Sequence, residues 1–144
     1  MSVREEFDAW AADGRDRGME ERHWHTAKHV LARMPVGEGE TVLDLGCGSG
    51  YAARALVETR GASRSYGLDG SPEMVRNACS YTAPALRDRV AFVRGDFEHL
   101  PFAEDSLDHC FSMKAGGTLT YSSYSGAASA KRLSCLGRHG DGCW

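Results

Sequence analysis

The residues that decide the fold read VLDLGCGSG and occupy positions 42–50. The first four are mainly apolar and predict a short buried strand, and the three glycines that follow stand on alternate positions. Residues 51–59 then predict a helix. A strand, a glycine loop and a helix in this order bring open backbone amides close to a nucleotide, because glycine has no Cβ and permits a sharp turn. The stretch therefore predicts an α/β fold with a nucleotide-type ligand at the start of this helix.

The spacing of these glycines separates two kinds of ligand. Dinucleotide-binding folds use G-x-G-x-x-G, with the third glycine inside the first helical turn. Here the third glycine, Gly50, comes one residue early, and Asp44 stands two positions before the first glycine. A carboxylate at this point would repel a pyrophosphate and attract a ligand with a positively charged end. A dinucleotide site and a purely structural glycine turn remain as alternatives.

Length, charge and cysteine content limit the class of protein. The 144 residues suffice for one ordinary domain, and the net charge is −3. Residues 1–113 carry 19 acidic and 13 basic side chains, which argues against a nucleic-acid surface. The sequence predicts neither a membrane span nor a leader peptide. The five cysteines have no paired spacing, so we expect reduced thiols and a cytoplasmic protein.

Two helices are expected before the glycine loop, in residues 1–36. Val3, Phe7 and Trp10 form one apolar stripe, which predicts a helix over 3–12 that ends at Gly14. A second apolar face predicts a helix from about 19 to 34, stopped by Pro35.

No metal site is predicted, although two groups of side chains have suitable spacing. His25 and His29 are four residues apart on the second helix, but no acidic or cysteine partner accompanies them. We interpret them as polar residues on a half-exposed helix. Cys135, His139 and Cys143 are also four apart, but a fourth ligand is missing.

Three further strands follow the glycine loop. Residues 65–68 predict a strand that ends at Asp69, whose carboxylate suits the two hydroxyls of a ribose; a helix-capping aspartate is the alternative. Ser71 and Pro72 then suit the N-cap and first position of a helix. Residues 90–93 predict a third strand followed by Gly-Asp-Phe at 95–97, with an Asx turn as the structural alternative. Residues 107–112 predict the fourth strand.

These motifs resemble, in order and spacing, those of the class I S-adenosylmethionine-dependent methyltransferases that act on small molecules. The glycine loop matches their D-x-G-x-G-x-G motif, residues 95–97 match their adenine-edge motif, and 100–108 match their L-P-F-x-x-x-S-h-D pattern, where h is apolar. The resemblance implies a Rossmann-like, doubly wound parallel sheet of order 3-2-1-4 with helices on both faces. It also implies S-adenosyl-L-methionine as cofactor and a small-molecule methyl acceptor.

The resemblance further assigns roles to individual residues. Asp69 would hold the ribose, and Met74 would pack on the adenine, although a core methionine would look the same. Asp96 would accept the adenine amino proton, and the Phe97 amide would donate to a ring nitrogen. The cofactor-binding residues that it implies are Asp44, Gly46, Cys47, Gly48, Gly50, Asp69, Gly70, Met74, Asp96 and Phe97. No catalytic residue is identified, because any base is expected beyond the fourth strand.

The resemblance ends near Met113, where composition changes. Residues 1–113 are interpreted as the N-terminal part of a methyltransferase domain, with the cofactor-binding half-sheet at 41–113. Residues 114–144 are expected to be an atypical, disordered tail with one short strand at 118–121. The change is typical of a truncated gene or a reading-frame shift. An incomplete sheet would leave the fourth strand at its edge, with Phe111 and Met113 poorly covered.

Three functions are consistent with the sequence. The first is an S-adenosylmethionine-dependent methyltransferase. The second is a catalytically inactive cofactor-binding fragment or an interaction module, which the missing strands favour. The third is an NAD(P)-dependent oxidoreductase, which Asp44 and the early third glycine disfavour.

Overall fold

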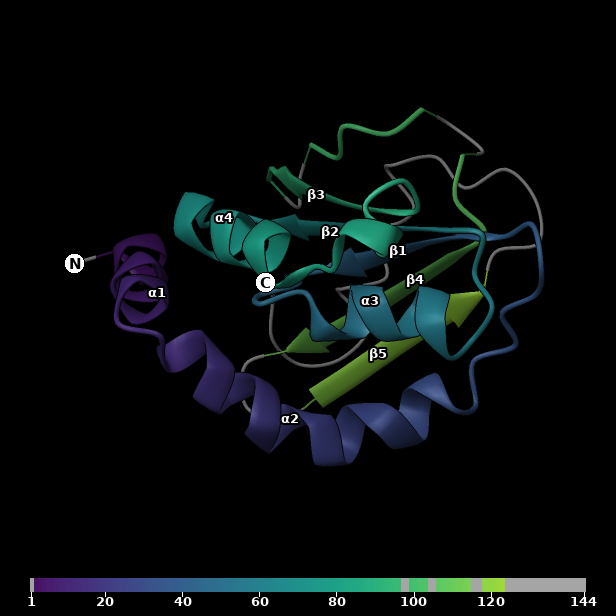
Figure 1. The fold of residues 1–144 in the computed structure, drawn as a ribbon, viewed down its shortest axis with the longest axis horizontal. Helices are drawn as coiled ribbons and strands as arrows, with labels where there is room; N and C mark the ends of the chain where they lie inside the picture. Colours follow the sequence, from purple (N-terminus) through teal and green to yellow (C-terminus); the bar gives the residue numbers. More distant parts are fainter. Residues whose placement is uncertain (1, 97–98, 104–105, 115–117, 124–144) are drawn as a thin grey trace.

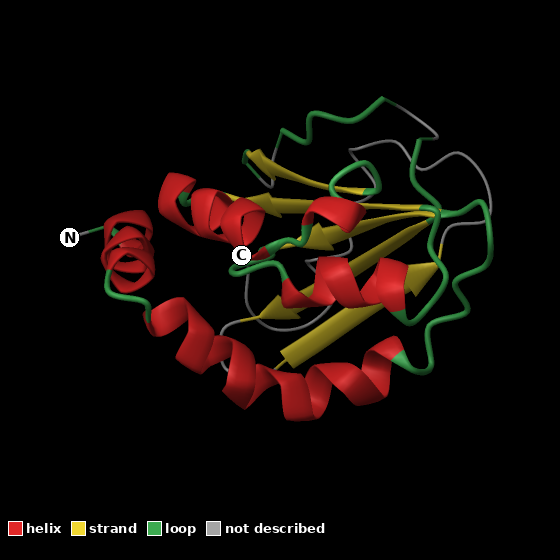
Figure 2. Ribbon diagram, viewed as in Figure 1, coloured by secondary structure: helices red, strands yellow, loops and turns green. Residues whose placement is uncertain are grey.

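The computed structural model describes residues 2–96, 99–103, 106–114 and 118–123 (Figure 1). After two N-terminal helices, strands and helices alternate up to residue 94, and strands follow at 109–114 and 118–123, as Figure 2 shows. None of the helices in these ranges is long and apolar enough to cross a membrane. The elements are α1 (Val3–Ala12), α2 (Arg15–Leu31), β1 (Thr41–Leu45), α3 (Tyr51–Glu58), β2 (Arg64–Asp69), α4 (Pro72–Tyr81), a 3-10 turn (Pro84–Leu86), β3 (Val90–Arg94), β4 (His109–Lys114) and β5 (Thr118–Ser123).

The sheet has the strand order β3-β2-β1-β4-β5, which confirms the predicted order 3-2-1-4. β1 lies at the centre and pairs in parallel with both β2 and β4. At its carboxyl end Leu45 is aligned with Leu68 on one side and with Ser112 on the other. After β1 the chain forms β2 and β3 on one side of this strand, and it then returns to form β4 on the other side. Ligands of α/β sheets bind at such a switch point. The glycine loop begins there.

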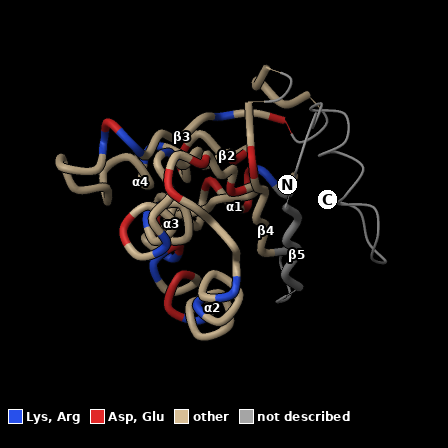
Figure 3. Tube along the Cα trace, turned by 90° about the vertical axis from the view of Figure 1, so that its right-hand side faces the viewer, with Lys and Arg blue, Asp and Glu red and all other residues tan. Residues whose placement is uncertain are grey.

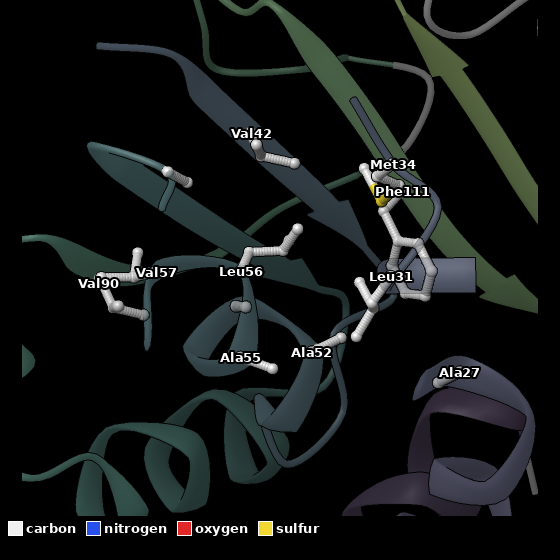
Figure 4. Packing of buried hydrophobic residues seen from close by; sticks show 12 residues of the cluster. Ala27, Leu31, Met34, Val42, Ala52, Ala55, Leu56, Val57, Val90 and Phe111 are labelled. Atoms are coloured by element: carbon white, nitrogen blue, oxygen red, sulfur yellow. The ribbon is translucent and has the colours of Figure 1, made fainter. Parts of the chain in front are cut away.

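The fourth strand is not an edge of the sheet, and that prediction is wrong. β5 pairs with β4 in antiparallel register, so the short strand expected at 118–121 is present and extends to Ser123. Phe111 is fully buried, and Figure 4 shows its ring beside Leu31 and Met34. Because these two residues lie in and just after α2, the N-terminal region covers the face of β4 that was expected to be open. Met113 is half-buried against the same cluster.

The three helices α2, α3 and α4 lie on one face of the sheet, as the two views in Figures 1 and 3 agree. α3 joins β1 to β2 and α4 joins β2 to β3. Since crossovers between parallel strands are right-handed and both connections move the same way along the sheet, both helices fall on the same side. Apolar residues of α2 and α3 pack with Val42, Val90 and Phe111.

The opposite face of the sheet is covered by a connecting segment. Here Leu43, Leu45 and Leu68 pack with Leu107, Cys110 and the partly buried Leu100 and Phe102. The chain is doubly wound, because the β3–β4 connection returns across this second face. Within the described ranges this connection contains no helix, so the expected helices are found on one face only.

The N-terminal helices are fixed to α4 by polar contacts between buried and half-buried groups. The Asn77 side chain donates to the Ala11 carbonyl at 2.9 Å and to Asp16 Oδ2 at 3.1 Å. Asp16 is almost fully buried, so its hydrogen bond replaces water that the carboxylate has lost. The Asp8 carboxylate accepts a short hydrogen bond from Ser71, at the start of α4. α1 and α2 therefore lie close to the carboxyl edge of the sheet.

Candidate functional site

The glycine loop is tied to the end of the neighbouring strand. The backbone amides of Gly46 and Cys47 both donate to the Leu68 carbonyl, at 2.8 and 3.0 Å. Gly46, Gly48 and Gly50 all have positive φ, at 70°, 52° and 85°. These conformations are costly for residues with a Cβ, so the sequence of alternate glycines follows from the backbone path of this turn.

The glycines differ in what surrounds them. A Cβ on Gly48 would meet no atom within 4 Å, whereas a Cβ on Gly50 would lie 2.5 Å from the Phe92 ring. A Cβ on Gly67, a residue that sequence reasoning missed, would lie 2.6 Å from the same ring. Gly50 and Gly67 therefore make room for Phe92 between sheet and helix, and Gly48 is the position with room for a ligand.

Asp69 joins the glycine loop to the start of α4. Its Oδ2 accepts from the Gly48 amide and its Oδ1 from the Ser71 amide, both at 2.9 Å. The N-cap of α4 is Ser71, as predicted, so Asp69 is not the capping residue. Burial raises the pKa of Asp69, and the hydrogen bonds from Ser71 and Gly48 act in the opposite direction. The carboxylate is thus held in place with lone pairs remaining for ribose hydroxyls.

Asp44 is buried at the centre of the sheet, with 2% of its surface exposed. Burial raises the pKa of this carboxyl well above its usual range, and the nearby Asp69 raises it further. A hydrogen bond from the Ala53 backbone and the charge of Arg54 oppose this shift. A cationic ligand group beside Asp44 would favour its charged form.

Replacing Asp44 by asparagine is expected to stabilise the ligand-free protein at neutral pH. When folding raises the pKa of a carboxyl group, the folded protein loses stability as pH increases from the unfolded pKa, near 3.8, towards the folded pKa. Asparagine cannot ionise and keeps an oxygen for the Ala53 amide. In urea unfolding from pH 4 to pH 8, the stability of Asp44→Asn minus that of the wild type should therefore increase with pH. A variant that is less stable than the wild type at pH 8 would contradict this account.

A second polar network connects α2 to the glycine loop. The Ser49 hydroxyl donates to Glu20 Oε2 at 2.7 Å, and Arg54 donates to the Ser49 carbonyl at 2.7 Å. Arg54 and Glu20 are also paired at 3.7 Å, with side chains only 11% and 22% exposed. Sequence reasoning missed Glu20, because an acidic residue on an amphipathic helix carries no signal of a distant partner.

The residues predicted to contact the edge of the adenine follow β3, and the end of β3 lies next to Asp69. The Gly95 amide donates to the Asp69 carbonyl at 3.0 Å, and a Cβ on Gly70 would lie 3.8 Å from the Gly95 carbonyl. Asp96 is exposed, with Oδ2 3.6 Å from His99 Nδ1. The fold thus brings the ends of β2 and β3 together, as the ribose and adenine assignments require.

Two of the remaining predicted cofactor residues are buried. Met74 and Cys47 are buried, with 1% and 3% of their surfaces exposed. The Cys47 thiol lies 3.7 Å from the Gly48 carbonyl. Phe97 lies outside the described residues.

Within the described ranges, no group of three or more His, Cys, Asp or Glu side chains has a geometry that could hold a metal ion. His25 and His29 lie on α2, and the side chains of both are exposed. Cys135, His139 and Cys143 lie outside the described residues.

Comparison with known proteins shows which family the chain is similar to. Residues 42–133 match the methyltransferase domain family. Over 95 residues the chain is 36% identical to the sterol 24-C-methyltransferase of Pneumocystis carinii, covering 65% of this chain and 24% of that protein. The matched family residues continue past Met113, where the motif resemblance was predicted to end.

Solved structures give a fold-level comparison. The methyltransferase in a complex with the Haloferax volcanii Trm112 methyltransferase activator has a TM-score of 0.73 and 68% identity, covering 79% of this chain and 49% of that one. Haemonchus contortus phosphoethanolamine N-methyltransferase 2, solved with S-adenosyl-L-methionine, has a TM-score of 0.57 and 28% identity, covering 64% and 21%.

The chain spans about a quarter of the sterol methyltransferase and about half of the Haloferax volcanii protein. The strand order of the sheet agrees with the Rossmann-like fold of these neighbours. The chain belongs to the methyltransferase domain family, in the class I group whose cofactor is S-adenosylmethionine.

Proposed function

We propose that this chain binds S-adenosyl-L-methionine and transfers its methyl group to a small-molecule acceptor. The observation that carries the proposal is Asp69, held by the Gly48 and Ser71 amides at the switch point of the sheet. The open space at Gly48 fits a ligand that approaches the loop backbone closely. The similarity to sterol 24-C-methyltransferases supports an apolar acceptor.

The residues present fit this cofactor better than a dinucleotide. Asp44 and Glu20 place carboxyl groups around the glycine loop, and these groups give a pyrophosphate no favourable partner. A ligand with an ammonium and a sulfonium would instead be attracted. Gly50 also serves the packing of Phe92, so the early third glycine has a structural cause as well.

Different residues along the carboxyl edge of the sheet would bind different parts of the cofactor. Asp69 would bind the ribose, the loop from Gly46 to Gly50 would hold the methionine part, and Asp96 with Phe97 would contact the adenine. When bound, the cofactor supplies a methyl group on a sulfonium for in-line displacement. The task of the protein is then to align the two reactants and exclude water. Ser112 and Met113, at the end of β4, would face the acceptor.

Calorimetric titration of the purified chain with S-adenosylhomocysteine tests the proposal. Saturable binding with a stoichiometry near one is expected. A dinucleotide such as NAD should neither bind nor compete. Absence of binding by a cooperatively folded chain would refute the proposal. Turnover with a panel of apolar acceptors would then separate an active enzyme from an inactive cofactor-binding fragment.

An interaction module is the second candidate, because the 68% identical Haloferax volcanii protein was solved in complex with the Trm112 activator. In this case the chain would bind an activator of that type. Co-expression of the two proteins, followed by size exclusion, should give one complex at equal stoichiometry. Separate elution of the two proteins would argue against it.

A cytoplasmic location is part of the proposal. It rests on the three free thiols of the described residues, Cys47, Cys79 and Cys110, which suit a reducing compartment.

A further inference from the structure

An aromatic pair lies on the helical side of the glycine loop. Trp24 on α2 is a large apolar side chain with 38% of its surface exposed. Its ring meets the Tyr51 ring edge to face, with centroids 6.1 Å apart and planes at 89°. This geometry is favourable for aromatic pairs, so the exposed indole is held in a defined orientation. Because Tyr51 directly follows Gly50, the indole is held beside the glycine loop.

The hydroxyl of Tyr51 has a weak partner. Among the described residues its hydrogen bond is to Met113 Sδ, at 3.2 Å. A thioether is a poor acceptor compared with an oxygen, and the tyrosine is half-buried. Burial and the nearby carboxylates of Asp44 and Glu20 raise the pKa of Tyr51, so the group remains an O–H donor. The Tyr51 hydroxyl could therefore donate a stronger hydrogen bond to an oxygen acceptor of a ligand.

Tyr51 and Met113 lie on the side of the glycine loop where the methyl acceptor is expected. Tyr51 directly follows Gly50, and Met113 lies on β4, next to Ser112, which is aligned with Leu45 of β1. Asp69 lies on the other side of β1, at the end of β2. The ribose carboxylate and the Tyr51–Met113 contact thus flank the glycine loop from opposite sides. A methyl group directed away from the ribose would face Tyr51 and Met113.

We propose that Trp24, Tyr51 and Met113 form the acceptor-binding wall, and that the acceptor is an apolar molecule with an oxygen that replaces the Met113 thioether as partner of the Tyr51 hydroxyl. The indole and the tyrosine ring contact the apolar body of the acceptor, and the O–H fixes its orientation. This inference rests on the proposed methyltransferase function and specifies the substrate class and the residues that recognise it.

Two probes in which an oxygen replaces one methylene group test the wall without knowledge of the natural acceptor. Binding of 2-ethylnaphthalene and of 2-methoxynaphthalene is measured by equilibrium dialysis at saturating S-adenosylhomocysteine. The wild type should bind the methoxy compound about fivefold more tightly, as expected for one net hydrogen bond of about 1 kcal/mol. Tyr51→Phe should remove this preference and leave the affinity for 2-ethylnaphthalene unchanged.

Two further variants separate the roles within the wall. Trp24→Ala should weaken both probes alike, because it removes apolar contact only. Met113→Leu should keep or increase the preference for the methoxy compound, because the Tyr51 hydroxyl then loses its thioether partner. Thermal unfolding of each variant shows whether it is folded, and Trp24→Phe replaces Trp24→Ala if the latter is not.

The outcomes distinguish this inference from the proposed function. If the wild type binds S-adenosylhomocysteine but has equal affinity for both probes, the proposed wall is wrong and the proposed function stands. The same holds if the preference survives in Tyr51→Phe. If the wild type does not bind S-adenosylhomocysteine, the proposed function fails, whatever the probes show.

Discussion

Replacing Asp69 by alanine is expected to lower the affinity for S-adenosylhomocysteine by about 100-fold or more. Two ribose hydroxyls donating to a carboxylate contribute about 1.5–3 kcal/mol each, and every 1.4 kcal/mol is a factor of ten. The variant also loses the acceptor for the Gly48 and Ser71 amides, so the glycine loop is held less firmly. Calorimetric titration measures the effect directly.

The control for this experiment is Asp13→Ala, which makes the same chemical change at an exposed position after α1. It should bind S-adenosylhomocysteine as the wild type does. Asp69→Asn should fall between the wild type and alanine, because the amide keeps one acceptor oxygen but loses the charge. Wild-type affinity in Asp69→Ala would show that the carboxylate has only a structural role.

Replacing Gly50 by alanine is expected to destabilise the fold far more than replacing Gly39. Both glycines have nearly the same φ, at 85° and 86°, so the conformational penalty of about 1 kcal/mol is shared. A Cβ on Gly39 meets no atom within 4 Å, whereas on Gly50 it would overlap the Phe92 ring. Forced overpacking of a core costs about 1–3 kcal/mol, which is the difference expected in urea unfolding.

A double-mutant cycle identifies the source of this cost. Phe92→Leu should destabilise the wild type but cost less, or be neutral, in the Gly50→Ala background, because the smaller side chain makes room for the new methyl group. The coupling should be about 1 kcal/mol or more. Equal stability of Gly50→Ala and Gly39→Ala would refute the steric role of Gly50.

Much of the fold could be predicted because its signals are local. The apolar run before the glycines, the alternate glycines and the Ser71-Pro72 helix start each depend on neighbours within a few residues, and each was confirmed. The strand order followed once these motifs indicated a family. The β4 prediction was displaced by two residues, because an apolar run does not mark where pairing with β1 begins.

The candidate site could be predicted only where it lies on strand ends. The sequence placed Asp44 inside the first strand, next to its carboxyl end, and Asp69 at the end of the second strand, because both strands are recognisable. It did not indicate that Glu20 contacts Ser49, which is 29 residues away, or that Tyr51 reaches Met113, 62 residues away. Such pairs form only when α2 and β4 are brought to the same edge.

The sequence by itself therefore determined the order of elements up to β4, the glycine turn and the positions of the two carboxyl groups of the candidate site, Asp44 and Asp69. Tertiary structure alone decided that Phe111 is buried by α2, that β5 covers the edge of β4, and that Gly50 serves Phe92. The physical reason is the range of the interactions. Backbone preference and capping act within a few residues, whereas packing and strand pairing depend on which distant segments meet.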